Sequence, residues 1–282
     1  MKFIKENFFL FKVHHWIKNL IIFLPIIASH SFLNITKSEY VLHFLNFSIL
    51  ASIVYLINNI NDYTTDIKNK KLRYSINLDK KKNYYIFSSL IIVIQTLILY
   101  LFDIEALIIC FIYLFVSITY NNFLRHQKYL DILIISLFHI LRIYYGAVVF
   151  EIELSLYFTL FCFFIFLMIG TNKRIIEVQK NFENRPYKLN DKKRLNLFQL
   201  LFGILAILTF FFYCIDPSKS QLFNNGYFLY INLVLIILII GNFLFFQKSI
   251  DQDIVVFIYS NKINFILVTI FFILFIRNSA FF

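Results

Sequence analysis

Residues 53–73 read IVYLINNINDYTTDIKNKKLR, an apolar run that ends in Asn and Asp side chains and then in Lys and Arg. At roughly 100° and 1.5 Å per residue, a helix places Asn58, Asp62 and Asp66 on one face, with Asn59 on its flank. Carboxylates at the end of a membrane segment are costly, and holding a divalent cation is a common reason for them. The stretch therefore predicts a membrane helix that ends in a cation and phosphate site. The alternative is a solvated helix end whose acids balance the nearby Lys.

Composition places the chain among integral membrane proteins. It is 60% hydrophobic and 20% aromatic, with a mean hydropathy of +0.74, well beyond an ordinary soluble domain. Apolar runs of about 18 residues or more predict nine spans. These spans are 17–33, which Pro25 interrupts, 40–60, 84–102, 104–120, 130–150, 154–171, 196–215, 227–247 and 263–281. These runs predict an all-α membrane protein. Because no Pro-, Gly- or Ser-rich linker divides the chain, we expect residues 1–282 to form one domain.

The basic residues predict the orientation of the spans. With the N-terminus in the cytoplasm, 23 of the 27 Lys and Arg lie on that side, and the opposite side holds only Lys37, Lys219 and Arg277. This asymmetry follows the positive-inside rule and predicts a cytoplasmic N-terminus and an outer C-terminus. The net charge of +11 then belongs at an anionic lipid surface, and we expect no nucleic-acid partner.

Further polar motifs fall on the same predicted cytoplasmic face. Lys18 and Asn19 precede the first span, and Tyr120, Arg125, Lys128 and Asp131 lie in and around the turn before the fifth. Trp16 and Lys18 also suit a plain interfacial anchor. Cys110, Cys162 and Cys214 fall within spans and are interpreted as core residues, and His139 as a packed residue.

Two basic positions have competing interpretations. Arg142 lies inside the fifth span, where a functional role competes with pairing to a buried acid or carbonyl. Gly146, one turn further, would permit close helix approach. Lys173 and Arg174 leave the sixth span, where Lys173 and Glu177 are spaced to pair on one helix face.

Taken in order, WIKN (16–19), YLINNINDYTTD (55–66), YNNFLRHQKYLDI (120–132), LRIYYGA (141–147) and NKRIIE (172–177) resemble the UbiA superfamily of intramembrane transferases. The pattern is most similar to the branch that transfers a 5-phosphoribosyl group from phosphoribosyl diphosphate to a polyprenyl phosphate. The resemblance implies a helical bundle around a central cavity that opens to the cytoplasm of a bacterial inner membrane. It also implies a Mg²⁺-assisted reaction in cell-envelope polysaccharide synthesis.

Carried across by position, the resemblance assigns roles to individual residues. Asp62, Asp66, Lys173 and Arg174 match catalytic positions, and Asp62, Asp66 and Asn59 match metal ligands. Residues that match substrate-binding positions are Lys18, Asn19, Asn58, Asn59, Lys70, Arg73, Tyr120, Arg125, Lys128, Asp131 and Arg142.

The chain departs from the family pattern at two places. Asn59 replaces the first carboxylate of the metal motif, and KKLRYSINL (70–78) lacks a Pro and an Arg that usually follow it. Mg²⁺ would then depend mainly on Asp62, Asp66 and the diphosphate of the substrate.

Three functions remain open from the sequence. An aromatic prenyltransferase needs two acidic motifs, whereas here the second motif carries Arg125 and Lys128, which suits two anionic substrates and favours phosphoribosyl transfer. A small transporter or lipid-binding scaffold would be expected to carry more ionisable residues within its spans. A related donor, or a catalytically degenerate lipid-binding protein, is the alternative that the departures at Asn59 and after the metal motif leave open.

Overall fold

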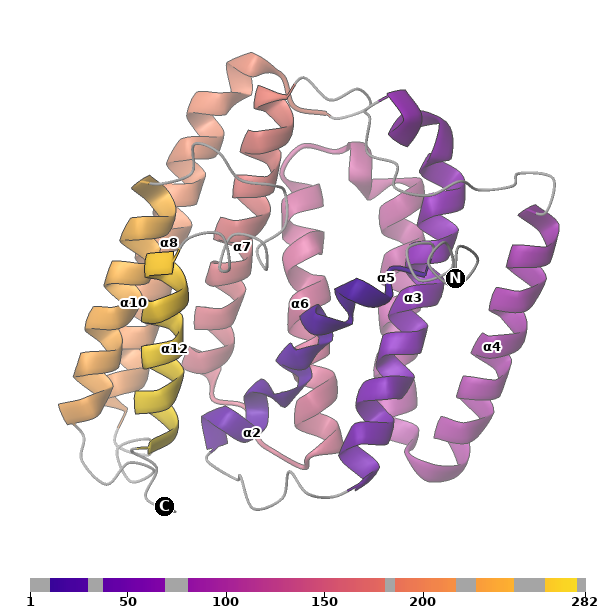
Figure 1. Ribbon diagram of the computed structural model, residues 1–282, viewed down its shortest axis with the longest axis horizontal. Helices are drawn as coiled ribbons and strands as arrows, with labels where there is room; N and C mark the ends of the chain where they lie inside the picture. Colours follow the sequence, from indigo (N-terminus) through magenta and orange to yellow (C-terminus); the bar gives the residue numbers. More distant parts are fainter. Residues whose placement is uncertain are drawn as a thin grey trace.

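The computed structural model describes residues 11–29, 38–68, 81–180, 186–216, 227–245 and 262–277. Within these ranges the chain is helical and no strand occurs. The elements run in the order η1 (Val13–Phe23), α2 (Leu24–Ser29), α3 (Ser38–Lys68), α4 (Lys81–Phe102), α5 (Ile104–Asn122), η4 (Leu124–His126), α6 (Leu130–Val149), α7 (Leu156–Gln179), η5 (Leu189–Asp191), α8 (Lys192–Ile215), α10 (Tyr227–Phe245) and α12 (Lys262–Arg277). Figure 1 shows the long helices running side by side across the molecule.

Each of the nine predicted spans coincides with helix in the described ranges. Six helical segments are long and apolar enough to cross a membrane, and two shorter apolar helices, Val13–Ser29 and Leu229–Phe245, accompany them. The six are Glu39–Thr64, Lys81–Phe102, Ile104–Asn122, Leu130–Val149, Leu156–Gln179 and Leu189–Ile215. These segments indicate an integral membrane protein.

Two helices extend beyond the ends predicted from hydropathy. Helix α3 continues to Lys68 and α7 to Gln179, eight residues past the predicted ends at 60 and 171. Hydropathy falls where polar side chains begin, but the backbone hydrogen bonds of a helix do not depend on that change. The polar residues at the end of α3, from Asn58 to Asp66, and at the end of α7, from Lys173 to Glu177, therefore lie on helices and not in loops.

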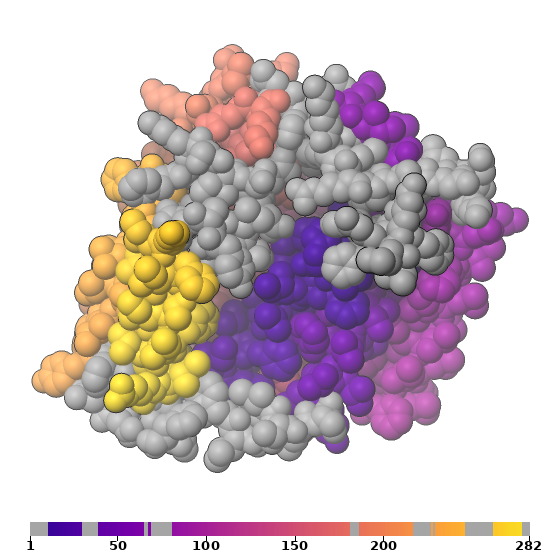
Figure 2. Space-filling view, in the orientation of Figure 1, coloured from indigo at the N-terminus to yellow at the C-terminus, as the bar shows by residue number. Residues whose placement is uncertain are grey.

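The first helical segment crosses the front of the bundle. Figure 1 shows η1 and α2 running obliquely over α6, and Figure 2 shows them exposed between α12 on one side and α3 on the other. Pro25 lies in the first turn of α2, where a helix needs no N–H from it. Residues before it, Val13–Phe23, form a 3₁₀ helix, so the predicted interruption at Pro25 is a change of helix type.

Gly146 brings η1 and α6 together. A Cβ added at Gly146 would lie 1.9 Å from the carbonyl oxygen of Ile22, a distance that no side chain tolerates. Ile22 itself is fully buried. The predicted close approach at Gly146 is confirmed, and its partner is the first helical segment.

Candidate functional site

A polar pocket of about 310 Å³ lies among η1, α3, α5, η4, α6 and α7. Its wall contains eight residues that the sequence predicts as site residues, from motifs up to 155 positions apart in the chain. They are Lys18, Asn58, Asn59, Asp62, Tyr120, Arg125, Arg142 and Lys173. Helical spacing explains the contribution of α3, because Asn58 and Asp62 are one turn apart on the face that meets the pocket.

The charges around the pocket favour an anionic ligand. Its wall carries five basic side chains, Lys12, Lys18, Arg125, Arg142 and Lys173, against the two carboxylates of Asp62 and Glu177. Coulomb attraction is stronger in a partly desolvated site than in water, so this excess attracts phosphate groups.

Asp62 is ion-paired to Arg125 across the pocket. Arg125 Nη1 donates to Asp62 Oδ1, which joins the turn after α5 to the end of α3. The Arg125 side chain is 11% exposed and the Asp62 side chain is 25% exposed, so both can still reach a ligand. The same arginine could donate to a substrate phosphate, and the carboxylate could accept a cation.

Arg142 is buried with neutral acceptors around it. Its Nε donates to Asn19 Oδ1 at 2.9 Å, one Nη to the Phe138 carbonyl at 2.7 Å and the other to the Tyr113 hydroxyl at 2.9 Å. Asn19 in turn donates to Ser48 Oγ at 3.0 Å. No carboxylate pairs with Arg142 among the described residues, so its positive charge is uncompensated at the pocket wall. Pairing to carbonyl groups, one of the two alternatives from the sequence, is therefore present.

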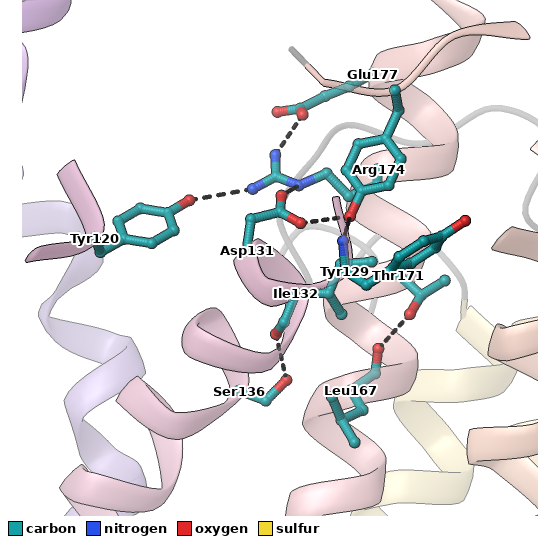
Figure 3. A network of polar contacts seen from close by, with 10 residues as sticks. Tyr120, Tyr129, Asp131, Ile132, Ser136, Leu167, Thr171, Arg174 and Glu177 are labelled. Carbon is teal, nitrogen blue, oxygen red and sulfur yellow. Dashed lines mark hydrogen bonds and ion pairs between the residues drawn. The ribbon is translucent and has the colours of Figure 1, made fainter. Parts of the chain in front are cut away.

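Arg174 is enclosed by carboxylates next to the pocket (Figure 3). Its guanidinium pairs with Asp131 and Glu177 and donates to the Tyr120 hydroxyl at 3.2 Å. Arg174 and Asp131 are fully buried. Glu177 therefore pairs with Arg174, three residues away, in addition to lying within helical reach of Lys173. In this arrangement Arg174 holds the side chains that face the pocket and does not itself line it.

Two further contacts tie the segment before α8 to the turn before α6. The Tyr187 hydroxyl donates to Asp131 and accepts from the Tyr129 backbone N–H at 2.7 Å. Burial, and next the negative charge of Asp131, raise the pKa of the Tyr187 hydroxyl, which stays protonated and able to donate. Lys128 Nζ lies 2.7 Å from Asp191 Oδ2, and this ion pair is the second contact between the turn before α6 and the segment before α8.

The buried polar atoms of the pocket that lack hydrogen-bond partners within the described part of the chain include Asn58 Oδ1, Arg125 Nε and His139 Nδ1. Buried polar groups are almost always paired in folded proteins. An acceptor and a donor that remain unpaired in the wall of one pocket indicate a ligand that carries both kinds of group.

The oxygen atoms of the pocket fit Mg²⁺ only together with an anionic ligand. Among the described residues, no group of three or more His, Cys, Asp and Glu lies close enough to hold a metal. Asp62 offers a carboxylate, and Asn58 offers an unpaired carbonyl oxygen. Because Mg²⁺ is commonly held by one or two carboxylates plus phosphate oxygens and water, this donor set suits a Mg²⁺–diphosphate complex.

An apolar cavity of about 230 Å³ lies beside the polar pocket, between α2, α7, α10 and α12. The His139 ring, in the polar pocket, stacks on Phe166, in the apolar cavity, with ring centroids 4.4 Å apart. The basic pocket and the apolar cavity therefore adjoin at this aromatic pair.

The remaining predicted site residues lie elsewhere. Asn19, Lys128, Asp131 and Arg174 are in the described part of the chain but outside the pocket wall, and each contacts a residue described above. Lys70, Arg73 and the side chain of Asp66 lie outside the described residues.

Sequence reasoning missed several residues of the site. His139 and Glu177 line the pocket, and helical spacing from Arg142 and Lys173 was the signal that could have identified them. Tyr187 and Asp191 carry no comparable signal, because their partners Asp131 and Lys128 are more than 50 residues away.

Comparison with known proteins gives three distant relatives, and no family model matches the chain. The decaprenyl-phosphate phosphoribosyltransferase of Mycolicibacterium smegmatis is 28% identical over 172 residues, covering 58% of this chain and 54% of that protein. An uncharacterized protein, y4nM, of Sinorhizobium fredii is 23% identical over 234 residues, covering 78% and 45%. The nodulation protein NoeC of Azorhizobium caulinodans is 24% identical over 210 residues, covering 69% and 67%. The chain spans about half the length of the first two.

Proposed function

We propose that this protein is a UbiA-like membrane transferase that moves a 5-phosphoribosyl group from phosphoribosyl diphosphate to a polyprenyl phosphate. The observation that carries the proposal is the basic pocket beside the apolar cavity, with one aromatic pair between them. A lipid phosphate needs both environments at once. The distant relative named for phosphoribosyl transfer to decaprenyl phosphate supports the same reaction.

The donor would bind at the end of the pocket formed by α3 and α7. Asp62, with Asn58, Asn59 and, by position in the motif, Asp66, would hold Mg²⁺, which when bound neutralises the diphosphate and makes it a better leaving group. Arg125 and Lys173 face the same space and would donate to the phosphate oxygens.

The acceptor would bind along η1 and α6. Lys18 and the uncompensated charge of Arg142 line this side of the pocket and would bind the lipid phosphate. The isoprenoid tail would occupy the apolar cavity beyond Phe166. Because the tail enters this cavity from the hydrocarbon of the bilayer and not from water, its burial would add packing contacts and not a hydrophobic gain.

The chemistry needs little from the protein beyond charge and position. An oxygen of the lipid phosphate is already anionic and attacks C1 of the ribose, while the bond from C1 to the diphosphate oxygen breaks and its electron pair leaves with the diphosphate. No general base is required. Arg125 and Lys173 would stabilise the charge that develops on the departing diphosphate.

Mass spectrometry of membranes that contain the protein tests this proposal. Incubation with phosphoribosyl diphosphate, undecaprenyl phosphate and Mg²⁺ is expected to yield a lipid heavier by one phosphoribosyl unit. Membranes that lack the protein are the control. A prenylated aromatic product, formed from a prenyl diphosphate in parallel incubations while no phosphoribosyl lipid appears, would instead assign aromatic prenyl transfer.

A further inference from the structure

Glu177 is a carboxylate in the wall of a pocket that otherwise attracts anions. It extends from the last turn of α7 and is 2% exposed, and it lines the pocket together with Lys173 and Asp62. A carboxylate repels phosphate and weakens the binding of a diphosphate by Coulomb repulsion. Its pairing with Arg174 offsets part of this charge, and its remaining acceptor capacity suits a part of the ligand other than a phosphate.

The position of Glu177 is determined by several buried contacts. Arg174 Nη1 donates to Glu177 Oε2, and the same guanidinium is held by Asp131, as Figure 3 shows. Asp131 in turn accepts from the Tyr187 hydroxyl. Because every member of this chain of contacts is buried, the Glu177 carboxylate is presented in one orientation beside the Arg174 guanidinium.

From this geometry we infer that Glu177 binds the ribose 2- and 3-hydroxyls of the sugar phosphate donor and so selects it over a prenyl diphosphate. The inference rests on the proposed function and identifies a specificity-determining residue within it. A carboxylate is an acceptor only, and vicinal hydroxyls are donors that it can bind in a bidentate manner. Carboxylates recognise ribose hydroxyls in the same way in dinucleotide-binding sites. A prenyl chain has no donor to offer, so it would leave Glu177 desolvated and unpaired by the ligand.

Binding measurements on purified protein test the inference without turnover. In the Glu177→Gln variant, the affinity for phosphoribosyl diphosphate is expected to fall about tenfold to a hundredfold, since charged hydrogen bonds to two hydroxyls weaken. The affinity for inorganic diphosphate is expected to stay unchanged or rise, because one repelling charge is removed. Glu153→Gln, a carboxylate in a separate pocket beside α2, is the matched control and should change neither affinity.

Competition on the wild-type protein gives a second measurement that does not depend on the folding of a variant. Ribose 5-phosphate is expected to compete with phosphoribosyl diphosphate about tenfold better than 2-deoxyribose 5-phosphate does. Equal competition by the two sugar phosphates, or parallel changes for both ligands in Glu177→Gln, would overturn the role of Glu177. Wild-type protein that binds phosphoribosyl diphosphate but makes no phosphoribosyl lipid would overturn the proposed function and leave the binding contrast standing.

Discussion

At the scale of single residues, the pocket depends on opposite charges held close together. Asp62 and Arg125 pair directly, and in the proposed function both side chains would contact a ligand that brings a cation and a phosphate together. The Mg²⁺–diphosphate complex would insert between them, with the cation toward Asp62 and the anion toward Arg125. Each side chain then exchanges one charged partner for another, which limits the desolvation cost of binding.

Replacement of Asp62 tests this role directly. In the Asp62→Asn variant we expect phosphoribosyl transfer to fall by about a hundredfold or more, because the amide removes the charge that holds the cation in an electrostatically organised site. Initial rates over a range of Mg²⁺ concentrations measure the effect. Glu39→Gln, an exposed acid in the first turn of the same helix, should retain wild-type rates. Undiminished turnover in Asp62→Asn would show that the reaction does not depend on a metal at this position.

The local period of α3 predicted several residues of the pocket, although the same kind of spacing on α6 and α7 was not used to find His139 and Glu177. Asn58, Asn59 and Asp62 fall on one helical face, and all three line the pocket. The sequence did not predict the enclosure of Arg174, because Asp131 and Tyr187 reach it through tertiary packing. Pairings of that kind leave no local pattern, so Arg174 was assigned a catalytic role and Tyr187 was not noticed.

At the scale of elements, the contact between η1 and α6 determines where the basic side chains of the first segment lie. Gly146 allows the backbone of Ile22 to approach α6, and Asn19, one turn earlier, meets Arg142. Lys18 is adjacent to Asn19 and lines the pocket. The absence of a side chain at one position on α6 therefore helps to position two polar residues on another element.

The Gly146→Ala substitution is expected to destabilise the protein. Because the new methyl group would meet backbone atoms of Ile22, η1 has to move, and overpacking of this kind costs about 1–3 kcal/mol. Thermal unfolding in detergent should show a lower midpoint for Gly146→Ala. Gly241→Ala is the matched control, since nothing lies within 4 Å of a Cβ at Gly241, and it should be neutral or stabilising by about 0.5–1 kcal/mol. Equal midpoints for Gly146→Ala and the wild type would contradict the close approach.

The sequence predicted the existence of the helices better than their ends. Hydropathy identified the apolar part of α3 and α7, but both helices continue through the polar motifs to Lys68 and Gln179. Hydropathy averaged over a window of residues detects where the chain leaves the apolar part of the membrane, and it does not detect where the helix ends. For function this difference matters, since a motif on a helix presents its residues at fixed spacing and a motif in a loop does not.

At the scale of the whole molecule, the charge asymmetry predicts which end of the bundle faces the cytoplasm. Cysteines introduced at Lys81, the first residue of α4, and at Lys188, before η5, should resist a membrane-impermeant thiol reagent added from outside. A cysteine at Glu105, exposed in the first turn of α5, should react. The native Cys110, Cys162 and Cys214 are buried and give little background. Outside labelling at Lys81 or Lys188 would reverse the predicted orientation.

The segments of the bundle follow from the sequence, and their lateral arrangement does not. Nine apolar runs predicted nine helical regions, because the length of a span is set by bilayer thickness. The oblique path of η1 over α6 (Figure 1) depends on side-chain packing among helices that are equally apolar, so composition carries no information about it. The site forms where this packing brings η1, α3, α5, η4, α6 and α7 together.

The partners of Arg142 also have a consequence for the biosynthesis of the protein. A lone Arg at the centre of a helix costs about 2.5–3.5 kcal/mol to insert into a membrane. Its acceptors, Asn19, Tyr113 and the Phe138 carbonyl, all precede it in the chain. Since the ribosome delivers the N-terminal segments first, Asn19 and Tyr113 have already reached the membrane when α6 leaves the translocon, and the Phe138 carbonyl arrives on α6 itself. The order of the segments thus provides a polar partner for the arginine at the moment of its insertion.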